Sequence, residues 1–305
     1  MRYYITLLIT LLWTGMTFAQ SEPKLSIFSY NPLYYNPAYA GVFDGLKVTG
    51  IYSTQMVGFE GAPKTLFFAA HSNVIARELG VGVDITSDKI GPVVNNKVVG
   101  NVAYYIQLDE ELNLTLGAKA GMNMFSIDYN LLSIENPEEY GLDSGRVTQN
   151  SPIIGAGMYL SNEKFFVGFS VPNMLKTKFY NESKTTVAST KPNSYVSAGY
   201  KFEVDDEVFI QPNILSNITP GAPVSHLLSV NMDYQKTMFG SLNYQPNASI
   251  GFLFGYRFEN NISVGYAYDY SLLQYTSSNA GSHTFYINFL IDELISSPHY
   301  GFGTF

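Results

Sequence analysis

The feature that most constrains this chain is an alternation of apolar with small or polar residues, which recurs in short segments along most of its length. Between residues 262 and 270, isoleucine, valine and tyrosine occupy the even positions, while serine, glycine, alanine and aspartate occupy the odd ones. A period of two is typical of a β-strand whose two faces meet different environments. Residues 112–123 repeat the pattern over a length that spans a bilayer core when the strand is tilted. Strands of soluble sandwiches are usually shorter, at about five or six residues.

Segments of this kind predict about fourteen strands. They are residues 46–53, 64–72, 80–86, 98–108, 112–123, 153–160, 164–171, 195–202, 208–214, 226–235, 238–244, 250–258, 262–270 and 284–290. Tight turns separate several neighbours, whereas residues 126–151, 172–193 and 271–281 are long links. Short links on one side and long links on the other are typical of outer-membrane barrels. We therefore predict an all-β fold, a transmembrane antiparallel β-barrel of about 14 strands, with the long links on the cell exterior.

The composition favours a membrane barrel and argues against several other classes. Only 14% of the residues are charged, against about 25% in soluble domains, and the chain holds 24 tyrosines and 21 phenylalanines. After the first twenty residues, no apolar run is long enough for a spanning helix. The net charge of −8 argues against nucleic acid as a partner. The absence of cysteine excludes a disulfide scaffold, a thiolate metal site and a lipid-anchored N-terminal cysteine.

The N-terminus has the pattern of an export signal. Arg2 supplies positive charge, residues 5–13 form a short apolar core, and Thr17–Ala19 is a small-x-small cleavage site. An uncleaved anchor helix is the alternative, and the short core followed by small residues favours cleavage before Gln20. The predicted organisation is a signal peptide at 1–19, a plug-like N-terminal segment at 20–45, a barrel at 46–291 and a C-terminal tail at 292–305.

A search for catalytic or metal-binding groups yields little. The four histidines are far apart in sequence, and we predict no metal, no cofactor and no catalytic residue. His71, His226 and His283 each adjoin a serine, but neighbours in one strand point to opposite faces and cannot form a dyad there. A dyad assembled across strands would make the barrel a lipid hydrolase, and this alternative stays open.

Glycines gather on the face that is predicted to line the lumen, as at residues 117, 121, 251 and 255. There they reduce side-chain volume and leave room for a channel, a plug or a bound segment. A passive, porin-like solute channel is therefore a further alternative function.

Three motifs resemble signatures of the PorP/SprF family, outer-membrane proteins associated with type IX secretion in Bacteroidetes. Residues 31–41 (NPLYYNPAYAG) resemble the opening signature, 55–65 (QMVGFEGAPKT) the second, and 297–302 (SPHYGF) the terminal motif. The matching residues are candidates for plugging the barrel or contacting a partner. They are Asn31, Pro32, Tyr34, Tyr35, Asn36, Pro37, Ala38, Tyr39, Gly41, Gln55, Gly58, Gly61, Ala62, Pro63, Thr65, Ser297, Pro298 and Tyr300.

This chain departs from the family pattern at three positions. Ser53 and Met56 stand where the second signature usually has Arg and Trp, and His299 stands where the terminal motif has Arg. The resemblance therefore implies no partner contact or barrel closure through these three positions of this chain, whereas the fold prediction rests on the strands.

The resemblance implies a non-enzymatic barrel in the outer membrane of a Gram-negative, Bacteroidetes-type bacterium. Its partners would be membrane lipid, a cognate type IX-secreted surface protein, such as a gliding-motility adhesin with a C-terminal secretion domain, and other secretion-system components. The opening signature also has a physical interpretation, because its prolines stiffen the chain and its tyrosines supply rigid apolar bodies. We expect this segment to fold into the barrel and seal it from the periplasmic side. The alternative is a surface loop that only precedes the first strand.

Overall fold

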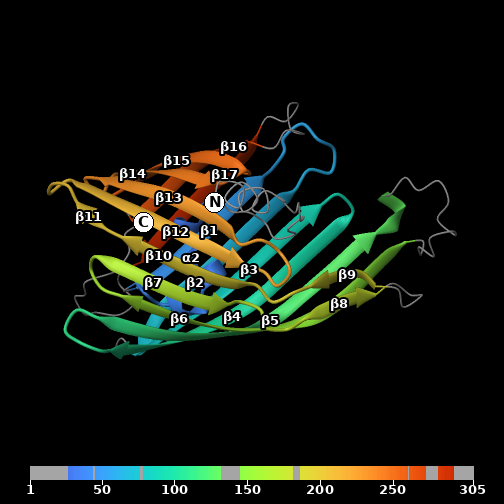
Figure 1. The fold of residues 1–305 in the computed structure, drawn as a ribbon, viewed down its shortest axis with the longest axis horizontal. Coiled ribbons are helices and arrows are strands. Elements are labelled where there is room, and N and C mark those ends of the chain that lie inside the picture. The colour runs from blue at the N-terminus through green and yellow to red at the C-terminus, as the bar shows by residue number, and fades with distance from the viewer. Residues whose placement is uncertain are drawn as a thin grey trace, which may run out of the picture.

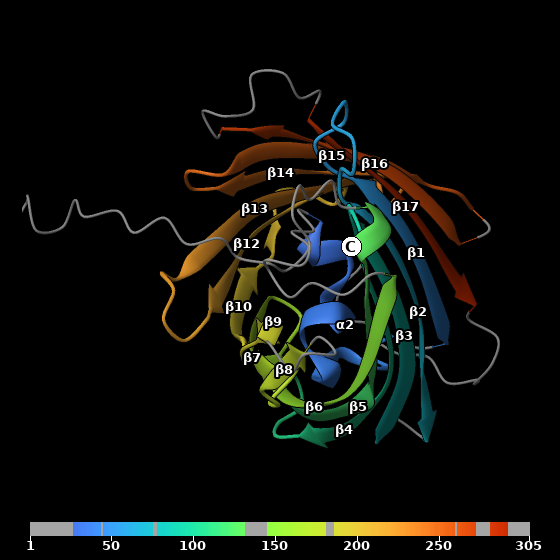
Figure 2. The same cartoon turned by 90° about the vertical axis from the view of Figure 1, so that its right-hand side faces the viewer.

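The computed structural model describes residues 27–43, 45–75, 78–131, 145–180, 186–259, 261–272 and 281–291. These residues form a closed antiparallel β-barrel of 14 strands, which Figure 2 shows along its length as a ring. Consecutive strands are neighbours, and the first and last strands, β1 and β17, pair to complete the ring. Because a closed barrel pairs its main-chain polar groups between strands, this architecture can stand in hydrocarbon. The predicted all-β, antiparallel barrel of about 14 strands is confirmed, whereas the plug-like role of the N-terminal segment stays a prediction.

Each predicted strand overlaps one strand of the barrel. The strands are β1 (Leu46–Thr54), β2 (Lys64–Ile75), β3 (Leu79–Ile90), β4 (Val93–Gln107), β5 (Asn113–Asp128), β6 (Arg146–Ser161), β7 (Phe165–Val171), β10 (Ser194–Tyr200), β12 (Val208–Ile218), β13 (Ser225–Tyr234), β14 (Met238–Gln245), β15 (Ser249–Arg257), β16 (Ile262–Ser271) and β17 (Ser282–Ile291). Outside the ring, β8 (Thr177–Tyr180) and β9 (Thr186–Thr190) form a separate hairpin, and β11 (Phe202–Glu203) pairs with the start of β12. The described helices are four short turns: η1 (Phe28–Tyr30), α2 (Pro32–Tyr35), η2 (Pro37–Tyr39) and η3 (Tyr129–Leu131).

The two faces of the strands differ as the alternation predicts. On β5, Thr115, Gly117 and Lys119 are buried and face the interior, whereas Leu116 and Met122 are exposed on the outside. The exposed positions of the other strands are likewise mostly apolar. This arrangement suits an outer surface in contact with lipid. Within the described ranges, no helix has the length and apolarity that a membrane crossing requires.

Several strands are longer than the sequence predicts. The link at residues 126–151 is partly strand, because β5 continues to Asp128 and β6 begins at Arg146. The link at residues 172–193 contains the β8–β9 hairpin. The alternation misses these parts because polar residues there occupy both faces, so the sequence loses its period of two.

The three longest connections leave the barrel at the same end. They are residues 129–145, 172–193 and 272–281, whereas 76–78, 162–164 and 235–237 connect strands at the other end. The end with the long connections also carries the short connections 91–92 and 246–248, so the predicted separation of short links from long links is present only in part. Which end faces the cell exterior stays a prediction.

Residues 27–43, here called the lumen segment, lie within the ring of strands, where Figure 2 shows α2 surrounded by the wall. Ile27, Leu33 and Ala38 of this segment belong to a buried apolar cluster that includes Phe67 and Phe239 of the wall. The apolar core of the molecule is thus the contact between the lumen segment and the inner face of the barrel.

Candidate functional site

Prolines and asparagines set the local fold of the lumen segment. Pro32 and Pro37 each stand at the start of a short helix, where a missing N–H group costs nothing and the fixed φ is already helical. Asn36 caps the second of these helices, because its side-chain oxygen accepts a hydrogen bond from Ala38 N at 3.0 Å. The repeated Asn-Pro pairs therefore produce a compact series of turns.

Hydrogen bonds tie the middle of the lumen segment to β6 and β7. The side-chain amide of Asn36 donates to the carbonyl oxygen of Met158 at 3.0 Å. The Ser170 hydroxyl donates to the carbonyl oxygen of Tyr35 at 2.7 Å. Asn36 thus shapes the segment and attaches it to the wall with the same side chain.

The end of the lumen segment is held by β2 and β4. Gly41 N donates to Nδ1 of His71 at 3.0 Å, which makes this buried histidine an acceptor for the main chain. The Tyr105 hydroxyl donates to the carbonyl oxygen of Ala40. His71, one of the three histidines considered for catalysis, therefore has a structural partner inside the barrel.

The beginning of the lumen segment reaches the opposite part of the ring. The Ser29 and Ser229 hydroxyl oxygens are 3.2 Å apart, and the Tyr30 hydroxyl donates to the carbonyl oxygen of Gly240 at 3.3 Å. The segment therefore contacts wall strands that are distant from one another around the ring.

Three inward glycines make room for the lumen segment. A Cβ atom at Gly117 would overlap the main chain of Ala38, one at Gly80 would overlap the carbonyl oxygen of Ala40, and one at Gly157 would overlap the Asn36 side chain. Among the interpretations left open for inward glycines, the structure places a segment of the chain itself against these three.

Other inward glycines accommodate the wall. A Cβ atom at Gly251 would meet the Asp269 carboxylate, and one at Gly255 would meet the Phe239 ring. The period-two pattern locates the inward glycines, but it cannot distinguish these two uses.

Aromatic contacts fill the space between the lumen segment and the wall. The Tyr30 ring centroid is 5.4 Å from that of Phe239 and 5.7 Å from that of Tyr286. Tyr39 meets Tyr159 edge-on, with ring centroids 5.7 Å apart. Burial raises the pKa of Tyr30 and of Tyr39 well above the ordinary tyrosine value. A tyrosine hydroxyl is neutral at physiological pH even without such a shift, so these residues add no charge to the lumen.

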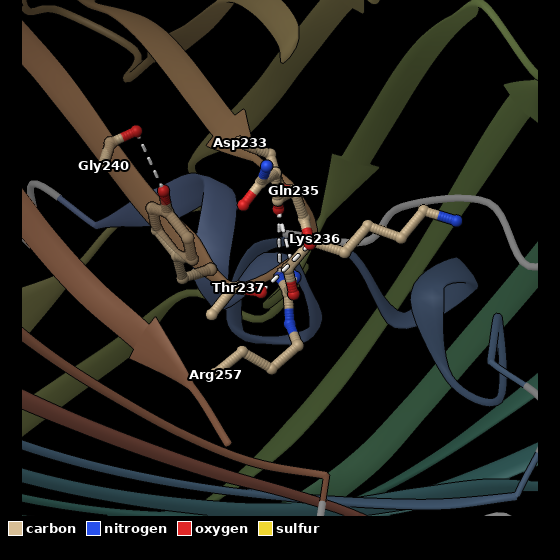
Figure 3. Close-up of polar contacts among 7 residues, drawn as sticks. Asp233, Gln235, Lys236, Thr237, Gly240 and Arg257 are labelled. Atoms are coloured by element: carbon tan, nitrogen blue, oxygen red, sulfur yellow. Dashed lines mark hydrogen bonds and ion pairs between the residues drawn. The ribbon is translucent and has the colours of Figure 1, made fainter. Parts of the chain in front are cut away.

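Ion pairs lie on two sides of the lumen segment. Lys119 Nζ is 3.9 Å from an Asp84 carboxylate oxygen and also donates to the carbonyl oxygen of Tyr34 at 3.5 Å. Arg257 lies 3.1 Å from Asp233 and donates to the carbonyl oxygen of Lys236, as Figure 3 shows. Arg257 thereby holds the turn between β13 and β14 beside the start of the lumen segment.

The second signature lies at the other end of β1 from the first. It forms the connection to β2, which closes through a hydrogen bond from Gln55 N to the carbonyl oxygen of Pro63 at 2.9 Å. Gly91 N donates to the Gly61 carbonyl oxygen at 2.8 Å, and Thr65 donates to the Asp88 carboxylate at 2.7 Å inside the barrel. The first two signatures are therefore not brought together, and Ser297, Pro298 and Tyr300 lie outside the described residues.

The two substituted positions of the second signature differ in environment. Ser53 is buried on the inner face, with its hydroxyl 2.8 Å from that of Thr284, whereas Met56 is exposed in the connection. An arginine at position 53 would enter the lumen beside β17, and serine leaves that space to a cross-strand hydroxyl pair.

One serine–histidine pair forms across strands. His226 Nδ1 lies 2.9 Å from the hydroxyl of Ser216 on the paired strand, rather than near its sequence neighbour Ser225, and the pair faces outward. Among the described residues, no carboxylate or amide side chain hydrogen-bonds to His226, as the group that orients the base of a catalytic triad would. The described ranges also contain no group of His, Asp and Glu that could hold a metal ion.

The match to a family model decides the family. The model described as Type IX secretion system membrane protein PorP/SprF matches residues 17–289. This chain belongs to the PorP/SprF family. The match runs through the lumen segment and nearly all of the barrel, so this family member carries both parts. A search of curated proteins finds no match.

Solved structures with similarity to this PorP/SprF family member include a channel, a transporter and an outer membrane protein. The CymD monoaromatic hydrocarbon channel has a TM-score of 0.50 at 12% identity, over 90% of this chain and 95% of that one. The Ralstonia pickettii toluene transporter TbuX has 0.48 at 10%, over 87% and 92%. The Acinetobacter baumannii outer membrane protein Omp33 has 0.45 at 10%, over 82% and 100%. At such identities the likeness concerns the fold alone.

The contacts of Asn36 lead to a stability prediction. Asn36→Ala removes a helix cap and a hydrogen bond to the wall, so the free energy of unfolding should fall by about 1–3 kcal/mol. Asn130→Ala, at an exposed position, is the matched control and should change it by less than about 0.5 kcal/mol. Denaturant titration of the purified protein in lipid vesicles measures both, and equal effects would contradict this role for Asn36.

Proposed function

We propose that this protein is a non-enzymatic outer-membrane barrel of the type IX secretion system, which binds a cognate surface protein and helps to secrete or anchor it. The family match over residues 17–289 carries the proposal. The proposed location is the outer membrane of a Bacteroidetes-type bacterium, after cleavage of the signal peptide. The proposed partner is an adhesin-like protein with a C-terminal secretion domain.

The lumen segment acts in this proposal as a plug. Its support is the number of independent attachments, which come from β2, β4, β6, β7 and β14. Two glycines of the wall also make room for its main chain, and a third makes room for the Asn36 side chain. A permanently open diffusion channel does not need glycines that leave space for an internal segment. Plugging therefore favours a docking role over the porin-like alternative, and the outward Ser216–His226 pair without an orienting group gives the hydrolase alternative little support.

The partner would dock at the end that carries the long connections. Residues 129–145, 172–193 and 272–281 leave the barrel there, and loops on a rigid scaffold are the usual place for binding residues. In the proposed orientation this end faces the cell exterior, where an exported protein arrives.

Deleting the coding sequence tests the function. The surface proteins of the deletion strain and of a complemented strain are compared by protease shaving and quantitative mass spectrometry. The proposal predicts that at least one large surface polypeptide falls tenfold or more in the deletion strain and returns on complementation. An unchanged set of surface proteins would contradict the proposal.

A further inference from the structure

Strand β6 continues far beyond its pairing with β7. On one side it pairs with β5 along its whole length, to the Arg146–Asp128 pair. On the other side the pairing with β7 ends at Ala156 and Val171. Figure 1 shows β5 reaching toward the end of the molecule where the β8–β9 hairpin lies. Residues 146–155 of β6 therefore have no ladder with β7 along their second edge.

The chain after β7 contacts β6 at Gly155 and Ile154 without extending the β6–β7 ladder. Pro172 follows β7, and its carbonyl oxygen lies where a Cβ atom on Gly155 would stand, so glycine is required there. Met174 N then donates to the carbonyl oxygen of Ile154 at 2.7 Å. The next described strands, β8 and β9, form a sheet with each other alone. Among the described residues, the second edge of β6 at residues 146–152 is paired with no strand, and this stretch is here called the open edge.

The direction of the main-chain groups follows from the same contact. The Ile154 carbonyl points to the open side, and in an antiparallel strand every second residue points the same way. Pro152 is two residues from Ile154 and so faces the same open side. Its position fits an unpaired edge, because proline has no N–H group to donate to a neighbouring strand. Thr148 and Asn150 then present main-chain N–H and C=O groups to the open side.

The environment of β6 changes along the strand. The outward side chain of Ile154 is apolar and 51% exposed, as expected in contact with lipid. Toward the long-connection end, the exposed side chains of β6 are Asn150, Thr148 and Arg146. Arg146 donates to the Ser126 hydroxyl on β5 at 3.0 Å, which directs its charge toward β5 rather than the open edge. This end of β6 therefore suits water, and Arg146 is the charged side chain among these exposed residues.

We propose that the open edge of β6 at residues 146–152 binds an extended segment of the exported surface polypeptide, which adds to the sheet as a strand. This rests on the proposed function and names the mode of docking. The occupant follows from the chemistry of the edge, which offers main-chain donors and acceptors at strand spacing. Its exposed side chains are polar, so an amphipathic helix or a lipid chain would gain little apolar contact there. Strand addition takes its affinity from main-chain hydrogen bonds.

The test removes the edge donors without removing the strand. The double substitution Thr148→Pro with Asn150→Pro deletes the two N–H groups on the open side, while the odd residues that bond to β5 keep theirs. Pro152 shows that this parity of β6 accepts proline. The matched control is Thr148→Ala with Asn150→Ala, which shortens the same side chains and keeps both N–H groups. Both barrels should reach the membrane equally and retain heat-modifiable migration in gels.

The readout is the surface amount of the polypeptide that the deletion strain loses. We expect at least a tenfold loss with the proline pair and less than a twofold change with the alanine pair. Full retention with the proline pair would overturn the strand-addition model while leaving the proposed function intact. Equal losses in the two variants would also overturn it, since side chains would then carry the binding. A third outcome would also overturn the model. If the proline pair abolishes self-association of the barrel but keeps the surface polypeptide, the strand that adds to this edge comes from a second copy of this chain.

Discussion

Replacing residues 28–40 by a glycine-serine chain of equal length is expected to convert an electrically silent barrel into one with steady open-channel current. In the intact protein these residues cross the ring and are attached to the wall on several sides. The replacement keeps the connection to β1 and the Gly41–His71 hydrogen bond, but it removes the Asn36 cap, the tyrosine rings and the side-chain hydrogen bonds of residues 28–40. Ions should then pass through the lumen, whose wall carries largely small and polar side chains.

Planar lipid bilayers measure this current directly. The unaltered protein, purified in the same way, is the reference and should show only brief or no openings. A steady current through the unaltered protein would contradict the plug and would favour the porin-like alternative. Silence of both proteins would show that something other than the lumen segment closes the barrel.

Gly117→Leu should have the second largest effect, because the new side chain must occupy the space of the Ala38 main chain. Backbone cannot yield as the far end of a flexible side chain does, so the lumen segment should shift away from β5. Overpacking of this kind costs about 1–3 kcal/mol. The free energy of unfolding should fall by at least that amount, and the barrel should begin to conduct.

The control for this substitution is Ala118→Leu on the outer face of the same strand. Ala118 is exposed, so a larger apolar side chain there should meet lipid and change the free energy of unfolding by less than about 0.5 kcal/mol. Denaturant titration and bilayer current are recorded for both variants. A Gly117 variant that is as stable and as silent as the control would contradict the fit between Gly117 and Ala38.

The strands could be predicted from the sequence because lipid and lumen impose different chemistry on alternate residues. Residues 112–123 show this well, and β5 contains nearly all of them. Where a strand has polar residues on both faces, the alternation disappears. This happens at Arg146–Ser151, so the sequence predicts β6 only from residue 153 onward. The same loss of pattern hid the open edge of β6.

The interior of the candidate site could be predicted only in part. The Asn-Pro pairs indicated a stiff, ordered segment, because proline fixes φ regardless of context. Its turns and partners depend on contacts between distant residues, such as the Tyr30 hydroxyl and the Gly240 carbonyl. The same holds for the Ser216–His226 pair, which depends on strand register rather than on sequence neighbours. No local pattern encodes such pairings.

A disulfide between positions 29 and 229 tests most directly whether the lumen segment lies inside the barrel. The Ser29 and Ser229 oxygens are 3.2 Å apart although 200 residues separate them, and the chain has no cysteine to interfere. In Ser29→Cys with Ser229→Cys, mild oxidation should cross-link most of the membrane-inserted protein, as peptide mapping would show. Ser29→Cys with Ser53→Cys is the control, on a different part of the wall. Absence of the 29–229 cross-link, with both thiols open to maleimide, would contradict the account.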